Sequence, residues 1–359
     1  MMKRIVLLVL VGLMASVASA TWYWEGDVSS SWADVENWNN GSGTPTVPHT
    51  TTERINVPGT TGVYPVSVDT SDQIGYLHIG RNDNGGTLSN AQVNLDTAGV
   101  TLTVSVGSGE IVSVAYSDNL TNNLNVSAGR LDVYRGNGAG ELRLNHVYNA
   151  TCVGNVNLSG TGIIDVEYLN KGGRDGGGNF YATGGNLIVR ARISKFGLTS
   201  SGYSGFNLGG ATLEIASWSD RSSAVGSIDI GGNEATDFFM DSTSAVKFDL
   251  GLSANNGGVA GTDYDLIVSR GNYAIAGELM VNFLAAPTVG DYWDVWTVMS
   301  GHEGAYDGSG AFNSLPSNIQ ASWIDTGTGN DTLRLTYVPE PATLILLGLG
   351  AIAIRRNKK

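Results

Sequence analysis

The sequence of 359 residues contains a single cysteine, Cys152. One thiol excludes both an intramolecular disulfide and a thiolate metal cluster. A lone cysteine among strand-forming residues is most often a small, buried apolar side chain. We therefore expect Cys152 to be buried and to have no catalytic role.

Charged residues are also scarce, at 15% of the chain, and basic residues are the scarcer kind. The formal net charge is −13, but the segments 1–20 and 339–359 hold six of the basic residues, and the body between them carries −18. Such a body repels phosphate backbones, so nucleic acid is not an expected partner. Cations, cationic polymers or cation-bridged acidic glycans are the electrostatic partners that remain.

Signatures of common catalytic sites are missing. The chain has no G-x-S-x-G nucleophile elbow and no Walker A loop. The four histidines are far apart, without the spacing of metal ligands, and we expect each in a loop or at the surface: His49, His78, His146 and His302.

Two oxygen-rich turns give only a weak indication of calcium. Gly327–Leu333 resembles one copy of the calcium-binding nonapeptide repeat, but those repeats bind Ca²⁺ between stacked turns, so one copy lacks half of each site. We expect an Asn-Asp turn before a strand over 333–335, and a similar turn at Asn82–Gly86. No cofactor and no metal site are therefore predicted.

Glycine is abundant instead, at 50 residues, and no helical periodicity of useful length occurs between residues 21 and 338. A pentad of the form small–x–aliphatic–x–aliphatic recurs, and shorter strand-like triplets such as Leu124–Val126 precede several copies. The pentads are Gly129–Val133, Gly140–Leu144, Gly162–Val166, Gly185–Val189, Ala211–Ile215 and Gly277–Val281.

The spacing of the pentads predicts a solenoid. Four copies align at Asp132, Asp165, Ile188 and Glu214, in steps of 33, 23 and 26 residues. Such irregular repeats are typical of stacked coils, whereas a β-sandwich has turns every 8–12 residues. We predict an all-β, right-handed parallel β-helix with N- and C-terminal β caps, a signal helix and a C-terminal hydrophobic sorting helix. Eight aliphatic side chains are expected to point inward: Leu131, Val133, Ile164, Val166, Leu187, Val189, Leu213 and Ile215.

The flanks of the repeats are rich in tryptophan. Residues 21–60 hold four of the eight tryptophans, and residues 262–337 hold Trp293, Trp296 and Trp323. Open ends of a solenoid expose strand edges, so we interpret both flanks as caps with aromatic side chains over the end coils. The predicted β-helix body then covers residues 61–261.

The N-terminal 20 residues have the pattern of a secretory signal peptide. A basic start precedes an apolar run and the small residues Ala18, Ser19 and Ala20. Cleavage after Ala20 would leave Thr21 as the first residue of the mature chain; an uncleaved membrane anchor is the alternative.

The C-terminal segment 338–359 combines three features in order. Val338-Pro339-Glu340-Pro341-Ala342-Thr343-Leu344 leads into an apolar run ending at Ile354, and the basic residues Arg355, Arg356, Lys358 and Lys359 follow. The run is shorter than the roughly 20 residues of a permanent span, and the basic tail favours the cytoplasmic side. These features suit a transient anchor, with a plain tail anchor as the alternative.

This segment closely resembles the PEP-CTERM sorting signal of Gram-negative bacteria. The resemblance implies recognition by an exosortase, a membrane transpeptidase, after passage through the secretion translocon, and cleavage near Pro339–Pro341. Members of this group are often associated with extracellular polysaccharide or biofilm. Localisation at the cell surface or in the matrix is therefore expected.

The body resembles the β-helix passengers associated with autotransporters, although no membrane barrel is present in the sequence. The resemblance rests on Trp22–Gly26, Ser31-Trp32, Asn37-Trp38, Gly261–Val268, Gly277–Leu279, Gly290–Trp296 and Gly310–Leu315.

One arrangement of polar residues raises the possibility of catalysis. The aligned repeats place Asp132, Asp165 and Glu214 in an outward column, with Tyr134, Glu167 and Arg190 in the next and Arg192 two residues further on. β-Helical polysaccharide lyases use carboxylates with a basic residue on such a face. The structural alternative is a solvated polar face on which Glu167 and Arg190 pair weakly.

We expect a non-catalytic, exported structural or adhesive protein that binds extracellular polysaccharide. A β-helical carbohydrate-active enzyme, either a lyase or a glycoside hydrolase, is the alternative, and a pure spacer without ligand is a third possibility.

Overall fold

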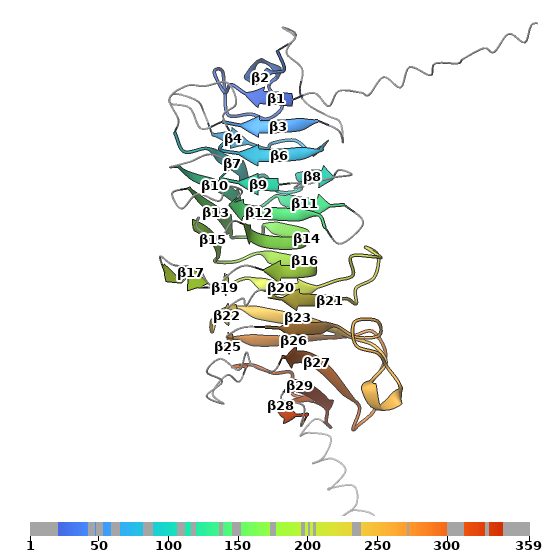
Figure 1. The fold of residues 1–359 in the computed structure, drawn as a ribbon. Helices are drawn as coiled ribbons and strands as arrows, with labels where there is room; N and C mark the ends of the chain where they lie inside the picture. Colours follow the sequence, from blue (N-terminus) through green and yellow to red (C-terminus); the bar gives the residue numbers. More distant parts are fainter. Residues whose placement is uncertain are drawn as a thin grey trace, which may run out of the picture.

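The fold is all-β, and most of its strands pair in parallel in a single stack (Figure 1). The computed structural model describes residues 21–41, 47, 53–58, 65–81, 89–105, 112–115, 120–135, 139–145, 152–172, 177–194, 198–199, 202–203, 206–231, 238–270, 273–299, 312–326 and 330–339. Within these ranges the only helical turns are two short 3₁₀ segments, η1 (Val35–Asn37) and η2 (Ala254–Asn256). The predicted signal and sorting helices lie outside the described residues.

The strands form three columns, each running along the stack from one turn of the chain to the next. The first column pairs β5 (Asp72–Ile74), β8 (Thr101–Ser105), β11 (Arg130–Tyr134), β14 (Ile163–Gly172), β16 (Asn186–Ser194), β20 (Thr212–Ile215), β23 (Ala245–Leu250) and β26 (Glu278–Phe283).

The second column belongs to the same sheet. It pairs β1 (Thr21–Trp24), β3 (Arg54–Val57), β6 (Tyr76–Ile79), β9 (Val112–Val114), β12 (Glu141–Asn145), the second halves of β14 and β16, β21 (Ser227–Ile230), β24 (Leu266–Ser269) and β27 (Tyr292–Val298).

The third column is a separate parallel sheet. It pairs β4 (Val66–Ser67), β7 (Gln92–Leu95), β10 (Thr121–Val126), β13 (Val153–Leu158), β15 (Gly177–Ala182), β19 (Phe206–Leu208), β22 (Phe238–Met240) and β25 (Tyr273–Ile275). The chain visits the third, first and second columns in turn and then repeats that order.

Antiparallel pairs occur at both ends of the stack and in one side hairpin. They are β1 with β2 (Trp38–Asn39), β17 (Leu198–Thr199) with β18 (Gly202–Tyr203), and β29 (Asp331–Tyr337) with both β27 and β28 (Ile319–Asp325). Parallel pairing extends from β1 to β27, so it continues beyond both ends of the predicted body, residues 61–261. The boundaries of that body remain a prediction.

Alternating aliphatic residues make the core, because successive side chains of a strand point to opposite faces. The eight residues predicted to point inward are all fully buried, and so is Cys152. Glycine is required where two backbone segments approach each other closely. A Cβ at Gly154, for example, would lie 1.5 Å from the carbonyl oxygen of Leu144. The pentad register predicted from the sequence is confirmed by the strand pairing.

Aromatic side chains continue this core along the third column. Phe180 stacks on Phe206 at 5.2 Å between ring centroids, and Phe206 stacks on Phe238 at 5.5 Å. Trp296 then meets Phe238 edge to face at 5.4 Å. Such contacts contribute beyond simple area burial and fix the register between coils.

Four buried tryptophans gather at the N-terminal end. Trp38 contacts Trp24 and Trp32 edge to face, at 5.0 and 4.6 Å. The indole of Trp32 donates to Asp72 of β5 at 2.7 Å, which ties this cluster to the parallel stack. Trp22 is buried as well, and all four tryptophans belong to the same hydrophobic core as the aliphatic residues of the strands; the cap at 21–60 stays a prediction.

Candidate functional site

The polar column predicted on β11, β14, β16 and β20 exists in register. Asp132 lies beside Asp165, Asp165 beside Ile188, and Ile188 beside Glu214. Asp132 and Glu214 are partly exposed, but Asp165 is completely buried. The expectation of a fully solvated face is therefore wrong for the centre of this column.

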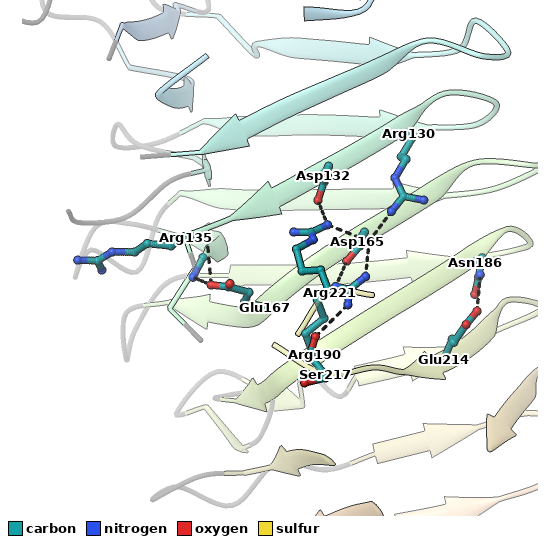
Figure 2. Close-up of polar contacts among 11 residues, drawn as sticks. Arg130, Asp132, Arg135, Asp165, Glu167, Asn186, Arg190, Glu214, Ser217 and Arg221 are labelled. Atoms are coloured by element: carbon teal, nitrogen blue, oxygen red, sulfur yellow. Dashed lines mark hydrogen bonds and ion pairs between the residues drawn. The ribbon is translucent and has the colours of Figure 1, made fainter. Parts of the chain in front are cut away.

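Asp165 is surrounded by three guanidinium groups (Figure 2). Arg190 binds it with two nitrogens, Nε to Oδ1 at 2.6 Å and Nη2 to Oδ2 at 3.0 Å. Arg221 donates to Oδ2 at 3.1 Å, and Arg130 donates to the same oxygen. This fork geometry is the strongest form of a carboxylate–arginine pair and compensates the burial of the charge.

The predicted pair of Glu167 and Arg190 is not formed. Glu167 accepts hydrogen bonds through Oε2 from the backbone N–H groups of Gly140 and Arg135, at 2.6 and 3.2 Å, and is fully buried. The β14–β16 register shifts between Val166 and Tyr168, so Glu167 lies in an irregularity of the ladder. In Figure 2 it points away from Arg190 and Arg221, toward the backbone of Arg135.

The pKa of Arg190 is raised above its ordinary value. Burial disfavours its charge, but the hydrogen bond and the charge of Asp165, with the charges of Asp132 and Glu214, outweigh that effect. Arg190 therefore stays protonated and has the wrong protonation state for a general base.

Arginines also hold a loop against the column. Loop 216–226, between β20 and β21, is fixed near its start by Nη1 of Arg190, which donates to the carbonyl of Ser217 at 2.9 Å. Arg221 reaches back from the loop to Asp132, 89 residues earlier, and lies 4.6 Å from the ring centroid of Tyr134. Of the residues first considered for catalysis, Arg190, Asp165, Asp132 and Tyr134 thus form a clamp that holds this loop against the sheet.

The two ends of the loop meet at its base. A Cβ at Gly226 would lie 2.2 Å from the carbonyl carbon of Ala216, so only glycine allows this approach. The N–H of Gly226 donates to Oδ1 of Asp265 at 2.8 Å, and Oδ2 of Asp265 accepts from the N–H of Asp249 at 2.6 Å. Burial raises the pKa of Asp265 to about 8, although both hydrogen bonds lower it.

A hollow of about 530 Å³ lies beside this loop, over the second column. Trp218 of the loop lines it and remains 41% exposed. From the strands come Tyr168, Arg192 and Asp229, which are consecutive in one outward row, and Arg270 follows β24. We call this the Trp218 hollow. Only Arg192 among these five residues was a candidate from the sequence, because Trp218 lies in a loop that the repeats do not cover and Tyr168, Asp229 and Arg270 lie outside the aligned pentads.

The exposed face of the third column has two ladders of asparagine side chains. In each ladder the amide of one coil donates to the amide oxygen of the preceding coil, at 2.7–3.0 Å. The ladders are Asn94–Asn125–Asn157 and Asn123–Asn155–Asn179. Tyr181 follows Asn157 in register and is exposed.

The predictions for histidine and calcium have mixed outcomes. His78 is buried in β6, so its expected surface position is wrong, while the other three histidines lie outside the described residues.

Asp331 begins β29, which confirms a strand at 333–335, and Asn82–Gly86 falls outside the described residues. No group of three or more His, Cys, Asp or Glu side chains suited to a metal occurs in the described part of the chain.

The processing sites lie at the edges of the described structure. Thr21 opens β1, while Ala18 and Ala20 fall outside the described residues. Val338 follows β29, and its N–H donates to the carbonyl of Asn318 at 2.9 Å. Pro339 is the last described residue; the remaining predicted sorting residues lie beyond it: Glu340, Pro341, Ala342, Thr343, Leu344, Arg355 and Arg356. Among the described residues, none of the helices has the length and apolar character for crossing a membrane.

Comparison with known proteins identifies one segment. No curated protein matches the chain. Residues 338–359 match the family described as the PEP-CTERM protein-sorting motif. This motif marks the chain as an exported protein of the cell envelope or surface that is targeted to an exosortase.

Proposed function

We propose that the body is a right-handed parallel β-helix. The support is the repeated order of three columns, with inward aliphatic side chains in every coil. Parallel strands joined by crossovers are right-handed in nearly all proteins. Such a rod presents long, flat polar faces, which suits repeated weak contacts with a polymer.

We propose further that this rod is a non-catalytic surface or matrix protein of a Gram-negative bacterium that binds extracellular polysaccharide. In this account a signal peptide directs it to the translocon, and the C-terminal helix anchors it transiently until exosortase cleavage near Pro339–Pro341. The single observation that carries the export half is the sorting motif, which begins at Val338, directly after β29. Cleavage there would leave every strand of the body intact.

The buried centre of the polar column supports the non-catalytic part of the proposal. A catalytic carboxylate or base must reach its substrate and change protonation state. Asp165 is buried under three guanidiniums, and Arg190 is committed to Asp165 and Ser217. The Trp218 hollow, by contrast, offers an exposed indole and polar groups to a ligand.

The alternative is a polysaccharide lyase or glycoside hydrolase that uses the Trp218 hollow. The observation in its favour is that this hollow holds a carboxylate, Asp229, together with Tyr168 and Arg192. A turnover assay separates the two functions, since only the enzyme releases products.

Intact-mass analysis of the protein recovered from its host tests the export half. We expect a species that starts at Thr21 and ends between Val338 and Pro341, and a longer membrane-bound species when the exosortase is deleted. A cytosolic protein that retains residues 1–20 and 339–359 would overturn the proposal.

A further inference from the structure

The Trp218 hollow has an unusual charge for this protein. It contains two arginines, Arg192 and Arg270, and one aspartate, Asp229, within a body whose formal charge is −18. Nε of Arg270 lies 4.0 Å from Asp229 and has no hydrogen-bond partner among the described residues. Local positive charge on an acidic rod points to an anionic ligand.

Arg192 is the most accessible of these groups. It is exposed, and its guanidinium lies 5.5 Å from the ring centroid of Tyr168. Within the described ranges no carboxylate forms an ion pair with it, in contrast to Arg190 two residues earlier. The guanidinium is therefore placed by an aromatic ring and presents its donors to solvent.

Two aromatic rings line the hollow together with the arginines. Trp218 comes from the clamped loop, and Tyr168 comes from β14. An exposed indole at a fixed position supplies a large contact area with little loss of conformational entropy. The hydrogen bonds from Arg190 to Ser217 and from Arg221 to Asp132 hold the loop on either side of Trp218 and so restrict the position of the indole.

The row has the length of a short oligomer. Tyr168, Arg192, Asp229 and Val268 lie on successive strands of the second column, and neighbouring strands are about 4.8 Å apart. The row from Tyr168 to Val268 therefore extends about 14 Å, three strand spacings. An open row of this kind fits consecutive units of a chain.

We propose that the Trp218 hollow binds carboxylate-bearing saccharide units of an extracellular polysaccharide. Arg192 and Arg270 bind the sugar carboxylates, Trp218 and Tyr168 pack against the pyranose faces, and Asp229 accepts from hydroxyl groups. This inference rests on the proposed polysaccharide-binding function and names the ligand class and its site. At physiological salt the charges of the acidic body are screened beyond roughly 8 Å, while direct arginine contacts persist.

Titration of the mature protein with oligogalacturonate tests this site, with the carboxyl-reduced form of the same oligosaccharide as the neutral control. We expect the wild type to bind the acidic form and to bind the reduced form at least about tenfold more weakly. Arg192→Gln and Trp218→Ala should each weaken binding of the acidic form by a similar factor. Arg334→Gln, which alters a partly exposed arginine of β29 that does not line the hollow, and Tyr181→Ala, which removes an exposed ring from the third column, should leave it unchanged.

The outcomes separate this proposal from the broader one. Equal affinity of the wild type for both oligosaccharides, or unchanged affinity in both hollow variants, overturns the assignment of the site. If those variants also bind the host polysaccharide like the wild type, the broader function stands and only the site is wrong. If the wild type binds neither oligogalacturonate nor the host polysaccharide, both proposals fail. Circular dichroism of each variant verifies that the strands are intact.

Discussion

Arg190 binds Asp165 through two nitrogens and at the same time donates its third to the carbonyl of Ser217. One side chain thus joins a buried carboxylate of β14 to the start of loop 216–226. Removal of one partner from a buried pair leaves an uncompensated charge, which is the costly case for ion pairs.

Asp165→Asn should therefore destabilise the protein by about 3–5 kcal/mol, because three guanidiniums would lose their shared carboxylate. Asp132→Asn is the matched control on the neighbouring strand. Asp132 is partly exposed and pairs with Arg221, so its loss should cost at most about 1 kcal/mol. Urea unfolding of both variants measures the difference, and equal losses would contradict the role of Asp165 as the centre of the clamp.

Gly226→Ala should open the base of loop 216–226, because the new Cβ would lie 2.2 Å from the carbonyl carbon of Ala216. We expect a loss of about 2 kcal/mol or more and faster proteolysis within the loop. Gly99→Ala is the control: its Cβ meets open space, and only the positive φ of 80° adds strain of about 1 kcal/mol. Equal protease resistance of wild type and Gly226→Ala would refute the tight closure.

Asn125→Ala tests the asparagine ladders. Asn125 donates to Asn94 and accepts from Asn157, whereas Asn179 makes a single ladder bond, to Asn155. With about 1 kcal/mol for each hydrogen bond, Asn125→Ala should cost about twice as much as Asn179→Ala. Unfolding free energies from urea titrations give the comparison; a larger loss for Asn179→Ala would argue against the ladders.

The raised pKa of Asp265 predicts that the stability of the fold depends on pH. Its pKa rises from 3.8 to about 8 on folding, mainly through burial, with the charge of Asp249 adding to the rise and that of Lys247 opposing it. Between these values the folded state holds a proton that the unfolded state releases, so stability falls as pH increases. The slope is at most about 1.4 kcal/mol per pH unit.

Unfolding midpoints between about pH 5 and pH 8 measure this slope. Asp265→Asn should flatten it. Asp241→Asn should leave it unchanged, because hydrogen bonds from Thr243 lower the pKa of Asp241 and its titration lies below this window. A slope that persists in Asp265→Asn would assign the titration to another group.

The sequence predicted the stacking register because alternation and spacing are local. Leu131, Ile164, Leu187 and Leu213 each begin a pair of inward side chains, and the same alignment placed Asp132 beside Asp165. The partner of Arg190 could not be predicted in this way. It depends on a break in the ladder after Val166, which no repeat pattern encodes.

The position of loop 216–226 could not be predicted from the repeats either. Arg221 contacts Asp132, which is 89 residues earlier, so the contact follows from how loop 216–226 folds back over the sheet. For the same reason Trp218 gave no signal as a ligand-binding residue. The C-terminal segment, in contrast, was predicted from three local features that follow one another in the sequence, and the sorting motif at 338–359 is confirmed by the family match.

The proposed function requires the exported protein to bind extracellular polysaccharide without cleaving it. The most direct measurement incubates the mature protein with polysaccharide from its host, and follows co-sedimentation together with the release of new chain ends. We predict co-sedimentation that weakens in Trp218→Ala and no new chain ends. Release of fragments, or the absence of any co-sedimentation, would contradict the account.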